Sequence, residues 1–348
     1  MPPLRTRFTE LVGIEHPIVQ DGMGPSRTSK LAAAVSEAGG LGTISIPGMT
    51  LGPKEAASRL REHIDETASL TAKPFAVNSP VGRNDAGVML PISEAYIDAV
   101  VAARRSDSQL ETQLKVLITS AGFPGEFRDR IADSGLIHIH KVGATRHALK
   151  AEAAGVDVII ASGYEMGGHT HVTPMHTFVL GPNVTGAVKV PVLISGGVRD
   201  GRTLAAALCL GADGVAMGTR FIATYDNQDW HPAYRERVLA AVEGDDLLFP
   251  GVYAPARGLR SKGAERLLEI VARGEMDLDE VTRWKDDQMT RAQVEGDVEN
   301  GLVPAGQVAC AINELVTVGE FVPAMAEEAA RILTGLVSSV VAPAAEPV

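Results

Sequence analysis

Residues 192–219 constrain the fold most, because two short apolar runs each end in glycine with one helical pattern between them. The runs read Val-Leu-Ile-Ser-Gly-Gly at 192–197 and Gly-Val-Ala-Met-Gly-Thr at 214–219. Glycines at the carboxyl ends of successive parallel strands let backbone N–H groups approach an anion closely. In a (β/α)8 barrel the loops after strands 7 and 8 are the usual phosphate site. The segment therefore predicts a barrel and a phosphorylated ligand, whereas plain strand–helix turns would need only single glycines.

Strand-like apolar runs alternate with helical patterns along the first two thirds of the chain. Eight runs are expected as strands, at 17–20, 42–46, 75–78, 116–119, 137–142, 156–161, 192–195 and 214–217. The helices between them are expected at 29–38, 53–67, 93–104, 125–134, 145–154 and 201–210. Near-continuous apolar strands with intervening helices predict a parallel sheet covered on both faces. Eight such units favour an α/β fold of the closed (β/α)8 type, a TIM barrel, and an open doubly wound sheet is the alternative.

The remainder of the chain predicts an addition to this barrel. Residues 1–224 and 321–338 are assigned to the barrel, the latter as a closing amphipathic helix. Residues 225–320 are charged, show helical patterns and are expected to form a helix-rich cap over the barrel mouth. Residues 339–348 are rich in Ala and Pro and are expected to be a frayed tail.

Composition limits the kinds of partner. The chain has 348 residues and a net charge of −11, which argues against nucleic acid or an anionic membrane as a general partner. The N-terminus lacks a signal-peptide pattern and no apolar run approaches the ~18 residues of a membrane span, so a soluble cytoplasmic protein is expected. Cys209 and Cys310 show neither a disulfide framework nor zinc spacing. Each lies in an apolar stretch and is predicted to be a buried small hydrophobe.

Polar and flexible residues follow several of the predicted strands. After the first strand, Gly22 and Gly24 allow the backbone to pass close to a flat ligand, and Met23 offers a soft apolar contact. Asn78 ends the third strand, where its amide can both donate a hydrogen bond to the edge of a flavin or a nucleobase and accept one from it. The alternative is that Asn78 caps the loop after the strand. Lys141 ends the fifth strand and is expected either near a flavin or phosphate or in an ordinary surface pair.

Residues 162–191 follow the sixth strand, begin as a long loop before a short helix-like piece, and carry the candidate base. His169 follows Gly167-Gly168 on this loop, and its unperturbed pKa lies close to a typical working pH. Long loops inside compact domains are usually functional. His171 and His176 make the loop rich in histidine, but no carboxylate ligand is paired with them, so no metal site is predicted.

The predicted phosphate cradle combines two strand ends. Its members are Ser195, Gly196, Gly197, Met217, Gly218 and Thr219. Thr219 would add a hydroxyl donor. Gln307, in Pro-Ala-Gly-Gln, lies close to the C-terminal end of the chain. Its neighbouring residues alone support it only weakly as a cofactor-binding residue.

Taken in order, these motifs resemble the nitronate monooxygenase family, formerly called 2-nitropropane dioxygenases. The resemblance covers about residues 5–335. It rests on His-Pro-Ile-Val-Gln at 16–20, Ala-Gly-Gly-Leu-Gly at 38–42, Pro-Phe-Ala-Val-Asn at 74–78, Glu-Met-Gly-Gly-His at 165–169, Ser-Gly-Gly at 195–197, Gly-Ala-Asp-Gly-Val at 211–215, Met-Gly-Thr-Arg-Phe at 217–221 and Ala-Gly-Gln at 305–307. The superfamily also contains flavin-dependent enoyl-acyl-carrier-protein reductases and NADH:quinone reductases.

The resemblance implies a TIM barrel that binds FMN without a covalent bond. Gly22 to Gly24 and Asn78 would contact the isoalloxazine and ribityl, Lys141 would lie near the ring, and Gln307 would approach from the C-terminal segment. The phosphate would lie against Gly196, Gly197, Gly218 and Thr219, with Gly168 beside the cofactor. His169 falls on the family's catalytic base, which takes the α-proton of a nitroalkane or orients the nitronate. Flavin and O2 then yield a carbonyl compound and nitrite.

Two positions depart from the family's usual pattern. The family commonly shows Gly-Gly-His-x-Gly, and here His171 occupies the last glycine position, where an imidazole would alter the loop and narrow the pocket. After the first strand, Gln-Asp-Gly-Met-Gly replaces Gln-Ala-Pro-Met and is closer to the reductase branches.

Three functions are therefore compared. The first is an FMN-dependent monooxygenase that acts on nitronates or nitroalkanes. A homodimer is compatible with the sequence. The second is an NAD(P)H-dependent FMN reductase acting on a quinone or an enoyl thioester; the chain lacks a dinucleotide fingerprint, but such reductases need not carry one. The third is a phosphate-binding barrel without redox chemistry. A barrel of the IMP dehydrogenase type is rejected, because neither cysteine lies on a strand-end loop.

Overall fold

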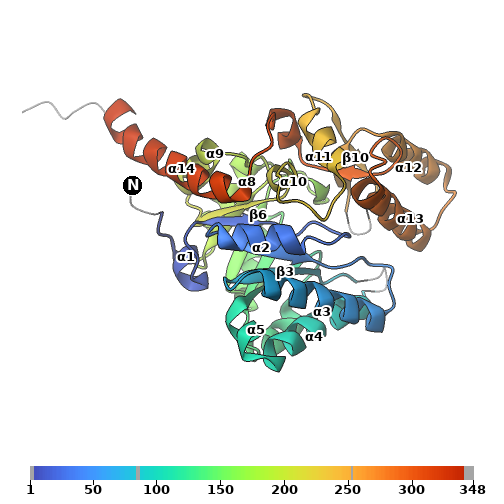
Figure 1. The fold of residues 1–348 in the computed structure, drawn as a ribbon, viewed down its shortest axis with the longest axis horizontal. Helices are drawn as coiled ribbons and strands as arrows, with labels where there is room; N and C mark the ends of the chain where they lie inside the picture. The colour runs from blue at the N-terminus through green and yellow to red at the C-terminus, as the bar shows by residue number, and fades with distance from the viewer. Residues whose placement is uncertain (1–3, 84–86, 252–253, 341–348) are drawn as a thin grey trace, which may run out of the picture.

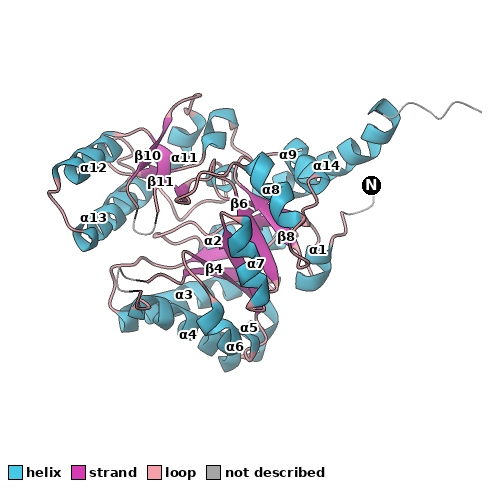
Figure 2. Ribbon diagram, turned by 180° about the vertical axis from the view of Figure 1, so that it is seen from behind, coloured by secondary structure: helices cyan, strands magenta, loops and turns pink. Residues whose placement is uncertain are grey.

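Eight parallel strands form the barrel of the computed structural model, which describes residues 4–83, 87–251 and 254–340 (Figures 1 and 2). Around the barrel the order is β1, β9, β8, β6, β5, β4, β3, β2, and a bridge between Val19 and Leu41 links the two ends of this sheet. The TIM-barrel prediction is confirmed. The strands are β1 (Ile18–Gln20), β2 (Gly42–Ser45), β3 (Phe75–Pro80), β4 (Leu114–Ser120), β5 (Ile137–Val142), β6 (Val158–Ser162), β8 (Val192–Ser195) and β9 (Gly214–Met217).

Helices cover the outside of the barrel. They are α2 (Ser29–Glu37), α3 (Pro53–Leu70), α4 (Pro91–Ser106), α5 (Ser108–Gln113), α6 (Arg128–Ala132), α7 (Thr145–Ala153), α8 (Thr177–Thr185), α9 (Gly201–Cys209) and α14 (Val318–Val340). The helix expected at 125–134 is instead a 3-10 turn, Gly125–Phe127, followed by the short α6. The long α14 packs against α9 and α2. Among the described helices, none combines the length and the apolar character that crossing a bilayer requires.

Aliphatic side chains fill the barrel interior below the site. Alternate residues of each strand point inward, and the inward set is Val19, Leu41, Ala76, Val116, Ile118, Ile139, Val158, Ile160, Leu193 and Ala216. Phe8 and Val12 of α1 (Arg7–Val12) join this cluster and close the lower end of the barrel. The interior is therefore a packed core, and the cavity described below opens at the other end of the barrel.

The segment after β9 is more sheet-like than its sequence predicts. It contains α10 (Thr219–Ile222), α11 (Pro232–Leu239), α12 (Lys262–Arg273), α13 (Leu278–Thr290) and a small sheet of β10 (Asp246–Phe249), β11 (Ala256–Leu259) and β12 (Val303–Pro304). These strands of two to four residues are too short for a clear period of two. Figure 1 shows this group at one end of the molecule and α14 toward the other. The division of the chain at 224, 320 and 338 stays a prediction, and α14 extends to Val340.

Both cysteines are exposed, so their predicted burial is wrong. Cys209 lies in the last turn of α9 on the same face as the exposed Arg202 and Ala206, because steps of three, four and seven residues return to one side of a helix. Cys310 lies in the 3-10 helix Gln307–Ala311, three residues after the exposed Gln307 and therefore on the same side.

Candidate functional site

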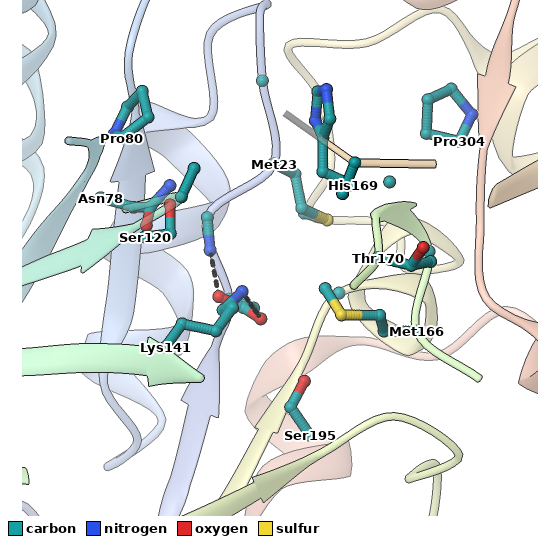
Figure 3. A pocket seen from close by; sticks show the side chains of 18 of the residues that line it. Met23, Asn78, Pro80, Ser120, Lys141, Met166, His169, Thr170, Ser195 and Pro304 are labelled. Carbon is teal, nitrogen blue, oxygen red and sulfur yellow. Dashed lines mark hydrogen bonds and ion pairs between the residues drawn. The ribbon is translucent and has the colours of Figure 1, made fainter. Parts of the chain in front are cut away.

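A cavity of about 790 Å³ opens at the carboxyl ends of the barrel strands (Figure 3). The predicted site residues that line it are Gly22, Met23, Gly24, Asn78, Lys141, Gly168, His169, Ser195, Gly196, Gly197, Met217, Gly218 and Thr219. Residues of the later segment also line it, including Trp230, Tyr234, Asp286, Met289 and Pro304. The cavity therefore lies between the barrel mouth and the segment that follows β9.

Strand periodicity explains why these polar residues meet. Asn78 comes two residues after the inward-facing Ala76, and Lys141 comes two residues after Ile139. The same step leads from Leu193 to Ser195. Because side chains of a strand alternate between its faces, each polar residue continues the inward row of its strand. The site is the top layer of the barrel interior, in which polar side chains and glycines replace the aliphatic ones.

Lys141 points into the cavity rather than to the protein surface. Its Nζ lies 2.5 Å from Asp21 Oδ2, and both side chains are largely buried. Asp21 follows β1, and its carboxylate also accepts the Gly22 N–H at 3.0 Å. The ion pair joins the ends of β1 and β5 across the floor of the cavity, where it can present a fixed cation to a ligand edge.

The glycines after β8 have backbone conformations that side chains rarely adopt. Gly196 has φ +97° and Gly197 has φ +78°. A Cβ on Gly197 would meet no described atom within 4 Å, whereas one on Gly196 would lie 3.0 Å from the Gly163 carbonyl oxygen. Gly218, directly after β9, has a φ of −106°, which any residue can adopt. Two successive left-handed residues turn the backbone into a concave surface that suits an anion.

Thr219 completes the cradle and connects it to the end of the later segment. Its Oγ1 accepts the Gly306 N–H at 2.9 Å. Because the hydroxyl accepts this bond, its own proton can be donated to an oxygen of a ligand. Gly306 lines the cavity, but the Gln307 side chain is exposed, contacts Asp246 at 3.3 Å and is not among the lining residues. The Ala-Gly-Gln motif thus reaches the cavity through its glycine.

The residues present fit a flat phosphorylated cofactor such as FMN. The Oδ1 of Asn78 is buried and has no hydrogen-bond partner within the described parts of the chain. A Cβ on Gly22 would collide with the Asn78 side chain, so a glycine is needed where the loop after β1 passes over Asn78. An unpaired buried amide oxygen carries a free-energy cost unless a ligand supplies a donor.

His169 is held by the small sheet, not by a freely moving loop. Gly168–His169 forms β7, and His169 pairs with Ala256 of β11 in antiparallel register. Burial, and secondly the charge of Lys285, lower the pKa of His169 to about 3. The imidazole is therefore neutral at pH 7.

Lys285 is a residue that the sequence analysis missed. It lies on α13 and is 2% exposed, with its Nζ 3.5 Å from His169 Nε2. Burial lowers the pKa of Lys285 to about 8, while neighbouring Asp286 opposes this shift. The ammonium group donates to Nε2, since a lysine has no acceptor. One signal in the sequence points to it: Lys285 lies four residues after Val281 and four before Met289, which places it on the apolar side of a helix that is otherwise charged.

A π-helix, Arg291–Glu295, follows α13 and positions one more polar residue at the cavity. Gln293 is 1% exposed; its Nε2 donates to the Gly24 carbonyl at 3.2 Å, and its Oε1 accepts the Ser26 N–H. π-Helical turns often occur at functional sites. Here the turn fixes the glycine loop that follows β1.

The other two histidines of the loop have separate environments. His171 lines the cavity, and its ring lies where a Cβ on Gly143 would be, so it fills space beside β5. His176 is directed to Glu165, with Nδ1 3.5 Å from Oε1. In the described part of the chain, no three histidine, cysteine or acidic side chains group in a way that could hold a metal ion.

Fold and cavity together define a (β/α)8 barrel with a cavity at the carboxyl ends of its strands. The chain belongs to the nitronate monooxygenase family, whose model matches residues 5–328. It is 37% identical over 267 residues to a Mycobacterium tuberculosis enzyme named (3aS,4S,5R,7aS)-5-hydroxy-7a-methyl-1-oxo-octahydro-1H-indene-4-carboxyl-CoA dehydrogenase, covering 76% of this chain and 68% of that one. A Rhodococcus jostii enzyme of the same name is 39% identical over 227 residues, which cover 65% of this chain and 58% of that one.

Other relatives carry a different name. A probable nitronate monooxygenase of Staphylococcus saprophyticus is 30% identical, covering 76% of this chain and 81% of that protein. Among solved structures, FabK from Thermotoga maritima is 34% identical with a TM-score of 0.83, covering 97% of this chain and 99% of that one. Nitroalkane oxidase from Streptomyces ansochromogenes, at 24% identity and a TM-score of 0.78, shares the fold and covers 94% and 99%. Membership of this family makes the chain an oxidoreductase.

Proposed function

We propose that this chain is an FMN-dependent oxidoreductase that oxidises nitronates with O2 to a carbonyl compound and nitrite. The glycine cradle carries the cofactor assignment, because consecutive left-handed glycines lie at the strand ends where barrels bind phosphate. Gly196, Gly197, Gly218 and Thr219 would hold the FMN phosphate. When bound, FMN supplies the electron transfer and the reaction with O2.

The residues beneath and beside the cradle would orient the ring. Asn78 offers an amide with an unused acceptor, and Lys141 offers a cation that Asp21 holds in place. Met23 would give a soft apolar contact to the ring. Together they would bind one edge and one face of a flat heterocycle.

His169 and Lys285 suit an anionic substrate better than a neutral one. A base with a pKa of about 3 removes a proton from a neutral nitroalkane inefficiently. A nitronate has already lost this proton and carries negative charge on its oxygens. Lys285 does not line the cavity but lies behind His169, so its buried ammonium would stabilise that charge across the imidazole. The neutral imidazole would orient the substrate. The nitronate is therefore the proposed substrate form.

A second candidate is the reduction of a quinone or an enoyl thioester. The relatives named as a carboxyl-CoA dehydrogenase and as FabK are 37% and 34% identical to this chain, more than the nitronate monooxygenase of S. saprophyticus at 30%. The enolate oxygen of a thioester would meet the same His169, with Lys285 behind it. This reading corresponds to the reductase alternative, in which NAD(P)H supplies hydride.

Anaerobic reduction of the purified yellow holoenzyme separates the candidates. The protein is mixed with propyl nitronate in one cell and with NADH or NADPH in another, and the visible flavin band is followed. Bleaching by nitronate alone supports the monooxygenase. Fast bleaching by a nicotinamide alone supports the reductase, and a protein purified without flavin would overturn both in favour of a non-redox phosphate-binding barrel. A homodimer stays a prediction.

A further inference from the structure

Two successive residues of α13 contact segments that follow opposite strands of the barrel. Lys285 contacts His169, which follows β6 in the chain. Asp286 Oδ2 accepts the Met49 N–H at 3.0 Å, in the turn after β2. In the circular strand order β6 and β2 are four positions apart and therefore opposite each other. The two contacts thus tie one turn of α13 to both segments, and Asp286 lines the cavity between them.

The turn that Asp286 contacts is itself held by the barrel. The hydroxyl of Tyr96, a buried residue of α4, donates to the Gly48 carbonyl. Gly48 has φ +121°, a conformation that side chains rarely adopt, and a Cβ on it would lie 3.4 Å from Asp286 Oδ2. The carboxylate of Asp286 is therefore packed closely against a turn whose position α4 fixes.

The contact of Asp286 also determines where its neighbour Lys285 points. Successive side chains of an α-helix lie about 100° apart around the helix axis. A bond from Asp286 to the turn after β2 therefore fixes the rotation of α13, and this rotation decides whether Lys285 is directed at His169. The distance from Lys285 Nζ to His169 Nε2 is 3.5 Å, which is long for a hydrogen bond. A small rotation of α13 would break this contact.

Asp286 supplies a negative charge to the buried ammonium of Lys285. From other elements, Lys285 is faced by the neutral His169 of β7 and by the ring of Phe249 of β10. On its own helix, the charge of Asp286 opposes the effect of burial and raises the pKa of Lys285. Burial raises the pKa of Asp286, and the Met49 N–H and the charge of Lys285 oppose that rise. The two buried charges therefore stabilise each other.

We propose that Asp286 positions Lys285 for the reaction, by anchoring α13 to the turn after β2 and by holding a negative charge beside the ammonium. The anchor needs only a hydrogen-bond acceptor at position 286, whereas the second role needs a carboxylate. Asp286 acts through Lys285 and His169 and takes no part in the chemical step. The inference rests on the proposed function, which assigns those two residues to the anionic substrate.

A titration of Lys285 itself tests the role of the charge. The holoenzyme is labelled at lysine Cε with a stable carbon isotope, and the signal that Lys285→Met lacks is followed by NMR against pH. Asp286→Asn keeps an acceptor for the Met49 N–H but has no charge, so half of the ammonium should be lost at about pH 7 instead of about pH 8. Asp287→Asn, the same charge change at the exposed next residue of α13, is the control and should keep the wild-type midpoint. Equal midpoints in Asp286→Asn and wild type would overturn the role of the charge.

Nitronate turnover at pH 6 tests the anchor, because Lys285 is protonated there with or without the carboxylate. Asp286→Asn should keep kcat/KM within about twofold of wild type, whereas Asp286→Leu, which has no acceptor, should lower it about tenfold, as the loss of one hydrogen bond predicts. An unchanged rate in Asp286→Leu, or equal losses in the two variants, would overturn the anchor. The NMR titration uses no substrate, so it tests the inference even if nitronate oxidation itself fails.

Discussion

Lys285 Nζ lies 3.5 Å from His169 Nε2, although 116 residues separate the two in the chain. Because Nζ donates to Nε2, the proton of the neutral imidazole is on Nδ1. Lys285 thus sets the tautomer of His169 and places positive charge beside it. His169 alone would be an ordinary histidine on a glycine loop; the pair is an electrostatic element suited to anions.

Replacing Lys285 by methionine should lower kcat/KM for propyl nitronate roughly 10- to 100-fold, because a buried charged hydrogen bond is lost. Wild type should lose activity above about pH 8, because Lys285 deprotonates there. The variant has no such group, so its activity should not show this loss. Rate profiles from pH 6 to 9 measure both effects. Lys285→Arg should restore part of the rate, and Lys262→Met, at an exposed ion pair with Glu299, is the matched control. An unchanged profile in Lys285→Met would remove the ammonium from the mechanism.

His169→Asn should retain FMN and lower kcat/KM for a nitronate about tenfold, because the hydrogen bond that orients the substrate is lost. The neutral nitroalkane should be a poor substrate of wild type and variant alike, since an imidazole with a pKa of about 3 is a weak base. Steady-state rates with 2-nitropropane and with its nitronate give the comparison. A loss confined to 2-nitropropane, with the nitronate rate unchanged, would show that His169 acts as a base and does not orient the substrate.

Gly218→Ala should reduce the FMN content without unfolding the chain. Gly218 has ordinary φ, and a Cβ there would lie 3.5 Å from Met23 Sδ, a normal contact. A methyl group at the cradle would therefore meet the phosphate rather than the protein. The flavin-to-protein absorbance ratio after purification, with thermal unfolding of the apoprotein, distinguishes the two effects. Gly319→Ala on α14, where a Cβ meets no described atom within 4 Å, should keep the wild-type ratio, and full flavin in Gly218→Ala would contradict the cradle.

Acid should destabilise the fold through buried histidines. Burial lowers the pKa of His138 to about 3 and that of His140 to about 4, and Thr119 Oγ1 lies 2.8 Å from a ring nitrogen of each. The unfolded chain binds protons first, so stability is retained above pH 6.5 and is lost as the pH falls toward 4. Each histidine contributes up to about 1.4 kcal/mol per pH unit.

Urea unfolding at pH 7, 6 and 5 measures this slope. His138→Gln should make the decline shallower, whereas replacement of the exposed His231 by glutamine should leave it unchanged. A slope in His138→Gln equal to that of wild type would show that this histidine titrates normally in the native state.

The repeating units of the barrel could be predicted from the sequence because each strand is an apolar run with a helix after it. Strand periodicity also predicts Asn78, Lys141 and Ser195 at the site, each at the end of such a run. Lys285 could not be predicted in this way, because its contact with His169 depends on how α13 packs over the barrel. The β7–β11 pairing was likewise inaccessible, since two residues carry no period. The cysteines were misassigned because an apolar neighbourhood in sequence does not say which face of a helix a residue occupies.

The pairing of β7 with β11 divides the cavity between two parts of the chain. The glycines that would hold the phosphate directly follow the barrel strands β8 and β9, whereas the backbone partner of His169 and the lysine beside it come from residues 246–290. Exchange of that later segment between relatives would change the groups that face the substrate while leaving the phosphate cradle intact. A barrel built in this way can acquire a new specificity by recombination of one contiguous piece, with the redox cofactor retained.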